Sequence, residues 1–203
     1  MKVKQVFFEY SLDGSDLNQL FTYCPMCRTK CNTRTEGGQV RPFCPKCGFI
    51  QYKNPAPAVA VLVVKDGQVL LGRRAANVFK GGLWCLPGGF IEFHEDFLTA
   101  ARREVWEETG LIVTIQGILS VVSNFLLPSL HSLVIVLLAE VNGGELCPGD
   151  DIAAAEWFPM AGPLPEMAFS ADQNIIERYA AGGVTIAPAD NEYALPAKKE
   201  RKP

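Results

Sequence analysis

Residues 89–111 have the sequence Gly89-Phe-Ile-Glu-Phe-His-Glu95-Asp-Phe-Leu-Thr-Ala-Ala-Arg-Arg103-Glu104-Val-Trp-Glu107-Glu108-Thr-Gly110-Leu111. Within it, Leu98, Ala101 and Val105 recur at helical spacing, which predicts a helix from about Asp96 to Glu108. Gly110 follows as a stop signal, because glycine favours the left-handed backbone that ends many helices. The sequence therefore predicts one amphipathic helix that is entered through a glycine-rich loop.

Three glutamates gather on the polar face of this predicted helix. Glu104, Glu107 and Glu108 stand at positions i, i+3 and i+4, so their carboxylates are neighbours. Like charges at that spacing repel one another, and a hard divalent cation with oxygen ligands removes the repulsion. The glycine loop lets the backbone pass close by, where the Gly89 carbonyl can also reach a metal ion. The pattern indicates metal-assisted attack of water on a phosphate group.

The same stretch resembles the Nudix box, with every defining position filled, and the approach Gly82-Leu-Trp-Cys-Leu-Pro-Gly88 is similar to the usual lead-in. The resemblance implies an α/β/α sandwich with a mixed sheet. It also implies Mg²⁺- or Mn²⁺-dependent hydrolysis of a nucleoside diphosphate that is linked to another group. Glu107 and Glu108 would be metal ligands, and Glu104 a further ligand or the residue that activates water. Arg103 would hold the glutamates by bidentate pairing, and Glu95 would support the loop or bind a second metal.

Residues outside the box are candidates for the rest of the site. Asp151 is the candidate for an extra ligand or base, with Glu156 second, although a polar turn after Pro148-Gly149 explains it equally well. Arg73 and Arg74 could clamp the second phosphate, or they could be solvated charges at the end of a strand. Phe79 and Phe125 are placed in loops, where each could stack on a purine or flavin or pack internally.

Four cysteines form two knuckles, Cys24-Pro-Met-Cys27 and Cys44-Pro-Lys-Cys47, with sixteen residues between them. Two such pairs can supply four thiolates in tetrahedral geometry, which predicts a structural Zn²⁺ site. A module of about thirty residues has too small a core to fold without the metal. Cys31 is a spare thiol that could replace a ligand in a mutant.

A zinc ribbon ahead of a Nudix domain resembles the NADH pyrophosphatases and the shorter ribbon-bearing hydrolases of ADP-ribose or FAD. The segment Ser123–Ser132 departs from the proline- and aromatic-rich signature of the NADH group. The segment Leu164-Pro-Glu-Met-Ala-Phe-Ser170 resembles a stretch in the ADP-ribose and FAD enzymes. ADP-ribose or FAD is therefore the favoured substrate, with NADH or NAD-capped RNA as the alternative. Related enzymes also suggest a homodimer.

The composition of the whole chain sets the remaining expectations. With 203 residues, 48% hydrophobic, and a net charge of −3, it is globular and has no general basic field for nucleic acid. The ribbon alone has a basic bias, so a nucleic-acid or protein adaptor is the hypothesis from another class. The uncharged stretch 112–139 is interrupted by polar residues and proline. It predicts two strands, Ile112–Val122 and Ser132–Val141, rather than a membrane span.

The chain is expected to divide into an N-terminal segment (1–22), the zinc ribbon (23–54), the Nudix domain (55–183) and a tail without fixed structure (184–203). An odd number of cysteines and the lack of an export signal at the N-terminus predict a cytoplasmic protein. A hairpin is predicted at Asp66-Gly67, and a last helix is predicted to open after Ser170, whose hydroxyl would cap it, and to stop at Gly182-Gly183.

Overall fold

The computed structural model describes residues 3–9 and 21–190, which fall into two compact units. Of these residues, the larger unit contains 3–7, 56–124 and 132–190, and the smaller unit contains 8–9, 21–55 and 125–131. Residues 1–2 and 10–20 of the predicted N-terminal segment, and residues 191–203 of the predicted tail, lie outside the described part.

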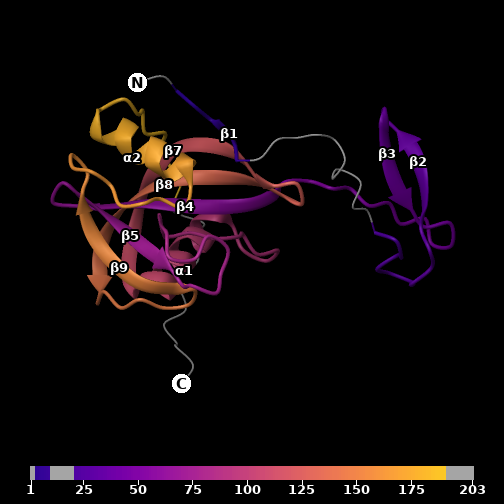
Figure 1. Cartoon of the computed structure of the whole chain (residues 1–203), viewed down its shortest axis with the longest axis horizontal. Helices are drawn as coiled ribbons and strands as arrows, with labels where there is room; N and C mark the ends of the chain where they lie inside the picture. Colours follow the sequence, from indigo (N-terminus) through magenta and orange to yellow (C-terminus); the bar gives the residue numbers. More distant parts are fainter. Residues whose placement is uncertain (1–2, 10–20, 191–203) are drawn as a thin grey trace. The chain divides into compact units, whose positions relative to one another are not determined.

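A mixed sheet of seven strands forms the core of the larger unit, in the order β1-β7-β8-β4-β5-β6 with β9 paired to β5 (Figure 1). The strands β4 and β8 run parallel, whereas β5 is antiparallel to β4, β6 and β9. The sheet therefore confirms the predicted mixed architecture. The strand bounds are β1 (Val6–Phe8), β4 (Ala56–Lys65), β5 (Gln68–Arg74), β6 (Trp84–Cys85), β7 (Leu111–Leu127), β8 (Leu130–Gly144) and β9 (Ile152–Pro159).

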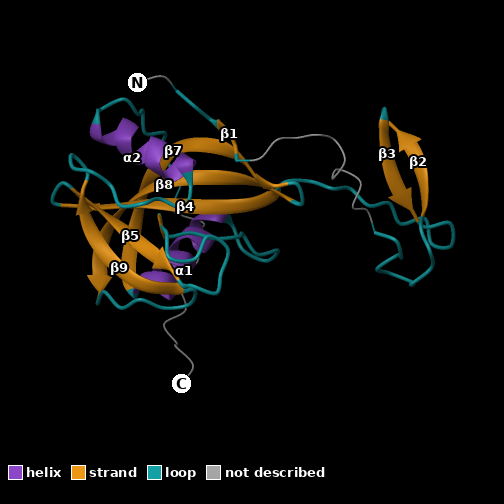
Figure 2. Cartoon of the chain, in the orientation of Figure 1, coloured by secondary structure: helices purple, strands orange, loops and turns teal. Residues whose placement is uncertain are grey.

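Two helices cover the two faces of this sheet, α1 (Phe97–Thr109) and α2 (Ser170–Ala180) (Figure 2). Strand β4 shows why, because successive side chains of a strand point to opposite faces. Its residues 58, 60 and 62 pack with Ile175 and Ile176 of α2, and residues 59, 61 and 63 pack with Ala101 and Val105 of α1. Burial on both faces explains the continuous apolar run of β4.

Helix α1 begins and ends where the sequence predicts, within one residue. Asp96 is its N-cap, and its Oδ1 accepts hydrogen bonds from the backbone N–H of Leu98 at 2.9 Å and of Thr99 at 3.0 Å. Gly110 ends it at φ 72°, a left-handed conformation in which the Gly110 N–H donates to the Trp106 carbonyl. These caps satisfy backbone groups that a helix end leaves unpaired.

Several expectations outside α1 needed adjustment. The predicted turn at Asp66-Gly67 joins β4 to β5 with positive φ at both residues, as expected for a tight hairpin. The two long strands are longer than predicted, so Phe125 belongs to β7 rather than to a loop. The cap predicted for α2 was wrong, because the helix already includes Ser170, its N-cap is Phe169, and no side chain caps it.

The smaller unit contains the cysteine knuckles and a two-stranded antiparallel sheet, β2 (Asn32–Glu36) and β3 (Gln39–Phe43). A bridge between Phe43 and Ile50 brings the chain after the second knuckle alongside β3. Beyond α2, in the larger unit, Ala187 forms two backbone hydrogen bonds with Ile118, of 2.8 and 2.9 Å. The first residues of the predicted tail therefore hold a defined position beside β7.

The described residues contain no helix that is both long enough and apolar enough to cross a lipid bilayer.

Candidate functional site

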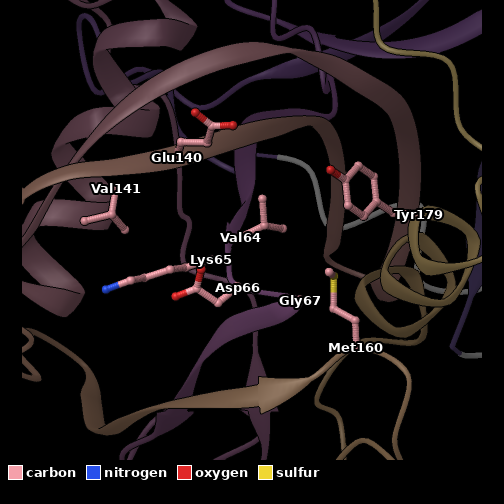
Figure 3. A pocket seen from close by; sticks show the side chains of 8 residues that line it. All are labelled: Val64, Lys65, Asp66, Gly67, Glu140, Val141, Met160 and Tyr179. Carbon is pink, nitrogen blue, oxygen red and sulfur yellow. The ribbon is translucent and has the colours of Figure 1, made fainter.

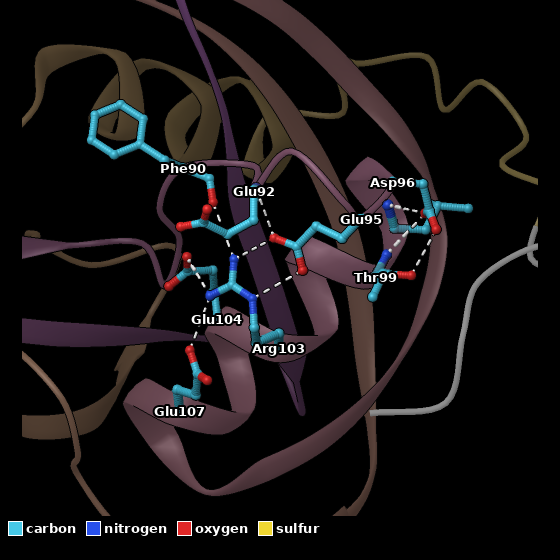
Figure 4. A network of polar contacts seen from close by, with 9 residues as sticks. Phe90, Glu92, Glu95, Asp96, Thr99, Arg103, Glu104 and Glu107 are labelled. Carbon is cyan, nitrogen blue, oxygen red and sulfur yellow. Dashed lines mark hydrogen bonds and ion pairs between the residues drawn. The ribbon is translucent and has the colours of Figure 1, made fainter. Parts of the chain in front are cut away.

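Arg103 is the centre of a network that joins the glutamates of the box (Figure 4). Its Nε and Nη2 donate to the two carboxylate oxygens of Glu95 at 3.0 and 2.6 Å, a bidentate pair. Its Nη1 donates to Glu104 at 2.8 Å and to Glu107 at 2.9 Å, the latter one helical turn further on. One guanidinium thus fixes three carboxylates, since its planar fork presents donors in several directions.

The same network ties the loop before α1 to the helix. Arg103 Nη2 also donates to the Phe90 carbonyl at 3.1 Å, and the Glu92 N–H donates to Glu95 Oε1 at 3.0 Å. Both oxygens of Glu95 therefore have partners, and Arg103 lowers the pKa of this carboxyl. No sequence signal marks Phe90, because its carbonyl rather than its side chain takes part.

Glu108 and Glu104 are the buried members of the set, with 2% and 7% of their surfaces exposed. A Glu108 oxygen accepts the backbone N–H of Gly88 at 2.9 Å. Burial raises the pKa of Glu108 well above its usual value, and burial also raises the pKa of Glu104 despite Arg103. A Cβ on Gly89 would lie 2.5 Å from a Glu104 carboxylate oxygen, so a side chain at this position would displace that carboxylate.

These residues fit a divalent cation in their chemistry. Three carboxylates pair with a single guanidinium, and a fourth, Glu108, lies inside the protein with the Gly88 backbone amide as its hydrogen-bond donor. Buried carboxylates require positive charge, and hard oxygen donors select ions such as Mg²⁺ or Mn²⁺. The Gly89 carbonyl accepts the Val59 N–H at 2.9 Å, which leaves one of its two lone pairs for another partner.

Asp151 lies close to this cluster and pairs with Arg74, whose Nη2 donates to Asp151 Oδ2 at 2.8 Å. The charges of Asp151 and Arg74 act in opposite directions on the pKa of Glu108, Asp151 raising it and Arg74 lowering it. The loop after Pro148 therefore lies near the carboxylates of the box, and a catalytic or metal-binding role for Asp151 stays a prediction. Arg74, the ion-pair partner of Asp151, also donates a hydrogen bond from Nε to the Phe79 carbonyl at 2.8 Å.

The other residues predicted to contact the substrate, Arg73, Phe79 and Phe125, do not form one cluster with the carboxylates. The guanidinium of Arg73 lies 5.9 Å from the centre of the Trp84 ring, so Arg73 and Arg74 have separate surroundings. Phe79 is in the loop after β5 and is 38% exposed. Phe125, in the smaller unit, stacks on Phe8 and on His131, with distances of 4.5 and 3.8 Å between ring centres. This is the internal packing that the sequence analysis gave as the alternative to binding a purine or flavin.

Lys80, which the sequence analysis did not single out, and Phe169 also belong to this region. Lys80 donates to the Ala168 carbonyl at 2.6 Å and lies 5.2 Å from the centre of the Phe169 ring. Arg74 lies 5.8 Å from the same ring. The Phe169 ring therefore contacts two cationic side chains, those of Lys80 and Arg74. Phe169 belongs to the segment that resembles the ADP-ribose and FAD enzymes.

The four knuckle cysteines of the smaller unit, Cys24, Cys27, Cys44 and Cys47, form a separate cluster. Their sulfur atoms all lie within 4.8 Å of one another, and Cys27 Sγ is 3.4 Å from Cys44 Sγ. Tetrahedral zinc with sulfur ligands at about 2.3 Å would separate them by about 3.8 Å. Hydrogen bonding with the side chain and backbone of Thr29 lowers the pKa of Cys27 to about 6, which favours the thiolate that binds metal. The cluster can therefore hold zinc.

A hollow of about 440 Å³ lies elsewhere in the larger unit, near the β4–β5 turn (Figure 3). Its lining includes Lys65, Asp66, Glu140, Met160 and Tyr179. None of the residues of the carboxylate network belongs to it, so this hollow is distinct from the candidate site.

A pH-dependent difference in stability tests the burial of Glu108. Burial raises the pKa of Glu108 in the folded protein above the pKa of a glutamate in the unfolded chain. As pH rises above the unfolded-chain pKa, ionisation of Glu108 therefore destabilises the fold, and the stability returns as pH falls. We expect Glu108→Gln to become progressively more stable than wild type from pH 5 to pH 8 without added Mg²⁺ or Mn²⁺. A cost of about 1 kcal/mol corresponds to about 2–4 °C in Tm for a chain of this size.

Thermal unfolding of both proteins across that pH range measures this effect. Glu177→Gln, on the exposed face of α2, serves as the matched control and should show a constant difference from wild type. A pH-independent difference for Glu108→Gln would contradict the assigned burial. Adding Mg²⁺ at pH 8 should stabilise wild type more than Glu108→Gln, since a bound cation offsets the buried charge.

Comparison with known proteins agrees with this geometry. The family model described as NUDIX domain matches residues 54–179. An ADP-ribose pyrophosphatase of Methanocaldococcus jannaschii is 43% identical over 129 residues, covering 63% of this chain and 75% of the relative. A NAD-capped RNA hydrolase NudC of Pasteurella multocida is 29% identical over 194 residues, covering 93% of this chain and 67% of the relative.

Solved structures agree as well. A NUDIX hydrolase from Nitrosomonas europaea superposes with a TM-score of 0.68 at 27% identity, covering 79% of this chain and 91% of the other. The chain spans between 54% and 59% of the length of further NudC relatives. The family match covers more than half of the chain and includes all the residues around Arg103. The protein therefore belongs to the Nudix family and is a Nudix hydrolase.

Proposed function

We propose that this enzyme hydrolyses the pyrophosphate bond of a nucleoside diphosphate linked to another group, with ADP-ribose or FAD as the favoured substrate. The observation that supports this most is the Arg103 network, which fixes Glu95, Glu104 and Glu107 within hydrogen-bonding distance of one guanidinium. The buried Glu108 adds a fourth carboxylate. Such a concentration of negative charge serves a cation-dependent reaction on phosphates.

Mg²⁺ or Mn²⁺ would be held by Glu104, Glu107, Glu108 and the Gly89 carbonyl. It would neutralise the pyrophosphate oxygens and lower the pKa of a bound water. We assign Arg103 and Glu95 to positioning, because Glu95 occupies two donors of Arg103 and connects the loop to the helix. With its orientation fixed in this way, Arg103 directs Nη1 towards Glu104 and Glu107.

Hydrolysis needs a base near the attacking water. Burial raises the pKa of Glu104, which moves this carboxyl towards the range in which a general base works. Glu104 or Asp151 would take the proton while the water oxygen bonds to phosphorus and the bridging P–O bond breaks. From ADP-ribose the products are AMP and ribose 5-phosphate, and from FAD they are AMP and FMN.

The remainder of the substrate would be held beside the carboxylates by cationic and aromatic side chains. Arg74 and Lys80 share the Phe169 ring, and Phe79 exposes part of its ring to solvent in the adjoining loop. Guanidinium and ammonium groups suit the second phosphate, and an aromatic ring suits a base or flavin. Arg73 would contribute from the exposed side of the same strand end, and Phe125 is the weakest of these candidates because it is already stacked.

NADH or NAD-capped RNA is the second candidate substrate. The observation that favours it is the alignment with NudC of Pasteurella multocida, which extends over 93% of this chain and thus beyond the Nudix domain itself. In contrast, the greater identity to an ADP-ribose pyrophosphatase favours the smaller substrate. Because the chain is a hydrolase of this family, an exclusively non-catalytic adaptor is no longer the alternative.

A hydrolysis panel distinguishes these substrates. Purified protein is incubated with Mg²⁺ or Mn²⁺ and ADP-ribose, FAD, NADH, diadenosine polyphosphates, deoxynucleoside triphosphates or NAD-capped RNA, and products are separated by chromatography. We expect AMP to form from ADP-ribose or FAD at least about tenfold faster than from NADH, since a single group that fits is worth about 1.4 kcal/mol or more. No hydrolysis of any substrate with either metal would refute the proposal.

We further propose that the enzyme is a cytoplasmic homodimer. All seven cysteines are unpaired, which suits a reducing compartment. Strand β1 lies at the edge of the sheet, and Val6 is 48% exposed there, so this edge offers an apolar surface to a second copy. Light scattering would give twice the mass of 22.2 kDa if the dimer forms, and the single-chain mass would refute it.

A further inference from the structure

The smaller unit concentrates positive charge that the rest of the chain lacks. Residues 21–55 contain six basic side chains and a single acidic one, Glu36. The rest of the chain contains thirteen basic and twenty-one acidic side chains. Five of the six basic residues are exposed and the sixth, Arg41, is half-buried; they are Arg28, Lys30, Arg34, Arg41, Lys46 and Lys53. Segregation of charge on this scale creates a local positive field on an otherwise acidic protein.

Two of these arginines lie directly opposite each other across the small sheet. The register pairs Arg34 of β2 with Arg41 of β3, so both side chains point to the same face. Like charges in that position repel and destabilise a sheet unless an anion lies between them. Arg34 has Glu36 at 3.1 Å, whereas among the described residues no carboxylate is paired with Arg41.

Aromatic rings fix the two guanidinium groups. Arg41 lies 4.8 Å from the centre of the Tyr52 ring, and Arg34 lies 5.4 Å from the centre of the Phe43 ring. The bridge between Phe43 and Ile50 brings Tyr52 level with Arg41, so these four residues form one face. Stacking of this kind holds a guanidinium plane while its N–H groups remain available to an outside acceptor.

We infer that this face, formed by Arg34, Arg41, Phe43 and Tyr52, binds the phosphate backbone of single-stranded RNA. Paired guanidinium groups match phosphate oxygens through bidentate hydrogen bonds, and aromatic rings beside them suit unpaired bases. The inference rests on the proposed function, in particular on NAD-capped RNA as a substrate, because RNA capped by a nucleotide would carry the pyrophosphate bond that the enzyme cleaves. Binding of RNA to this face does not depend on hydrolysis.

Fluorescence anisotropy with a labelled, uncapped 12-nucleotide RNA tests the inference on the full zinc-loaded chain. We expect Arg34→Gln/Arg41→Gln to weaken binding about tenfold and to reduce the slope of log K against log salt by about 1.4, since each phosphate contact contributes about 0.7. Arg34→Lys/Arg41→Lys should retain part of the affinity, because it keeps the charge. Lys65→Gln, an exposed lysine of the larger unit, is the control and should change binding less than twofold.

Zinc content and ADP-ribose hydrolysis of each variant show whether it is folded. Equal RNA affinity for wild type and the double glutamine variant would overturn the inference. So would displacement of RNA by a polyglutamate peptide at equal concentration, which would identify the face as a site for acidic proteins. If wild type hydrolyses no substrate of the panel but the double variant loses RNA binding, the proposed function fails and the RNA face stands.

Discussion

Replacing Glu107 by glutamine should lower the rate of pyrophosphate hydrolysis about a thousandfold, since several kcal/mol of transition-state stabilisation depend on a metal-bound phosphate. Glu107 is the most exposed of the three helix glutamates, with 39% of its side chain accessible. Its substitution therefore leaves the apolar core intact. The amide keeps the side-chain volume and an oxygen that can accept from Arg103, but it removes the negative charge.

Steady-state hydrolysis of the best substrate in the panel measures the effect, together with thermal unfolding. The Tm of Glu107→Gln should stay within a few degrees of wild type, because Glu107 forms one partly exposed ion pair with Arg103. Glu177→Gln on α2 again serves as the matched control, since it removes one exposed carboxylate that lies outside the network. Wild-type turnover by Glu107→Gln would show that the metal is not held as proposed.

Loss of the zinc ligands should unfold the ribbon. The apparent free energy of structural zinc binding is about 10–16 kcal/mol in small modules, more than a two-stranded sheet supplies by itself. Cys44 is 1% exposed and lies 3.4 Å from Cys27 between sulfurs, so serine at this position removes a central ligand. Because Cys31 could take the place of Cys44, the variant that we expect to lose zinc is Cys31→Ser/Cys44→Ser.

Metal analysis and amide hydrogen exchange are the measurements. The double variant should lose its bound zinc and the protection of β2 and β3, whereas Cys31→Ser alone should keep both. ADP-ribose hydrolysis should persist in the double variant, because Arg103 and its glutamates belong to the larger unit. Unchanged protection of β2 and β3 without zinc would contradict a metal-dependent fold, and retained zinc would show that other groups hold the ion.

Features with local causes could be predicted from the sequence. Helix geometry alone places Glu104, Glu107 and Glu108 on one face, because residues three and four apart are neighbours. Gly110 ended the helix as expected, since it supplies the left-handed backbone at φ 72°. Likewise Asp66-Gly67 fixed the hairpin between β4 and β5. In contrast, the cap at Ser170 was wrong, because a hydroxyl near a helix start caps only when its residue stays outside the helix.

The Nudix resemblance, the carboxylate-bearing helix and the two cysteine knuckles could be recognised without a structure, because each depends on short, fixed spacings along the chain. The fold was needed to show which groups share Arg103, that Asp151 pairs with Arg74, and that Arg34 lies opposite Arg41. Those pairings depend on strand register and on loops brought together across the sheet. They arise from packing of the whole chain, which no local spacing encodes.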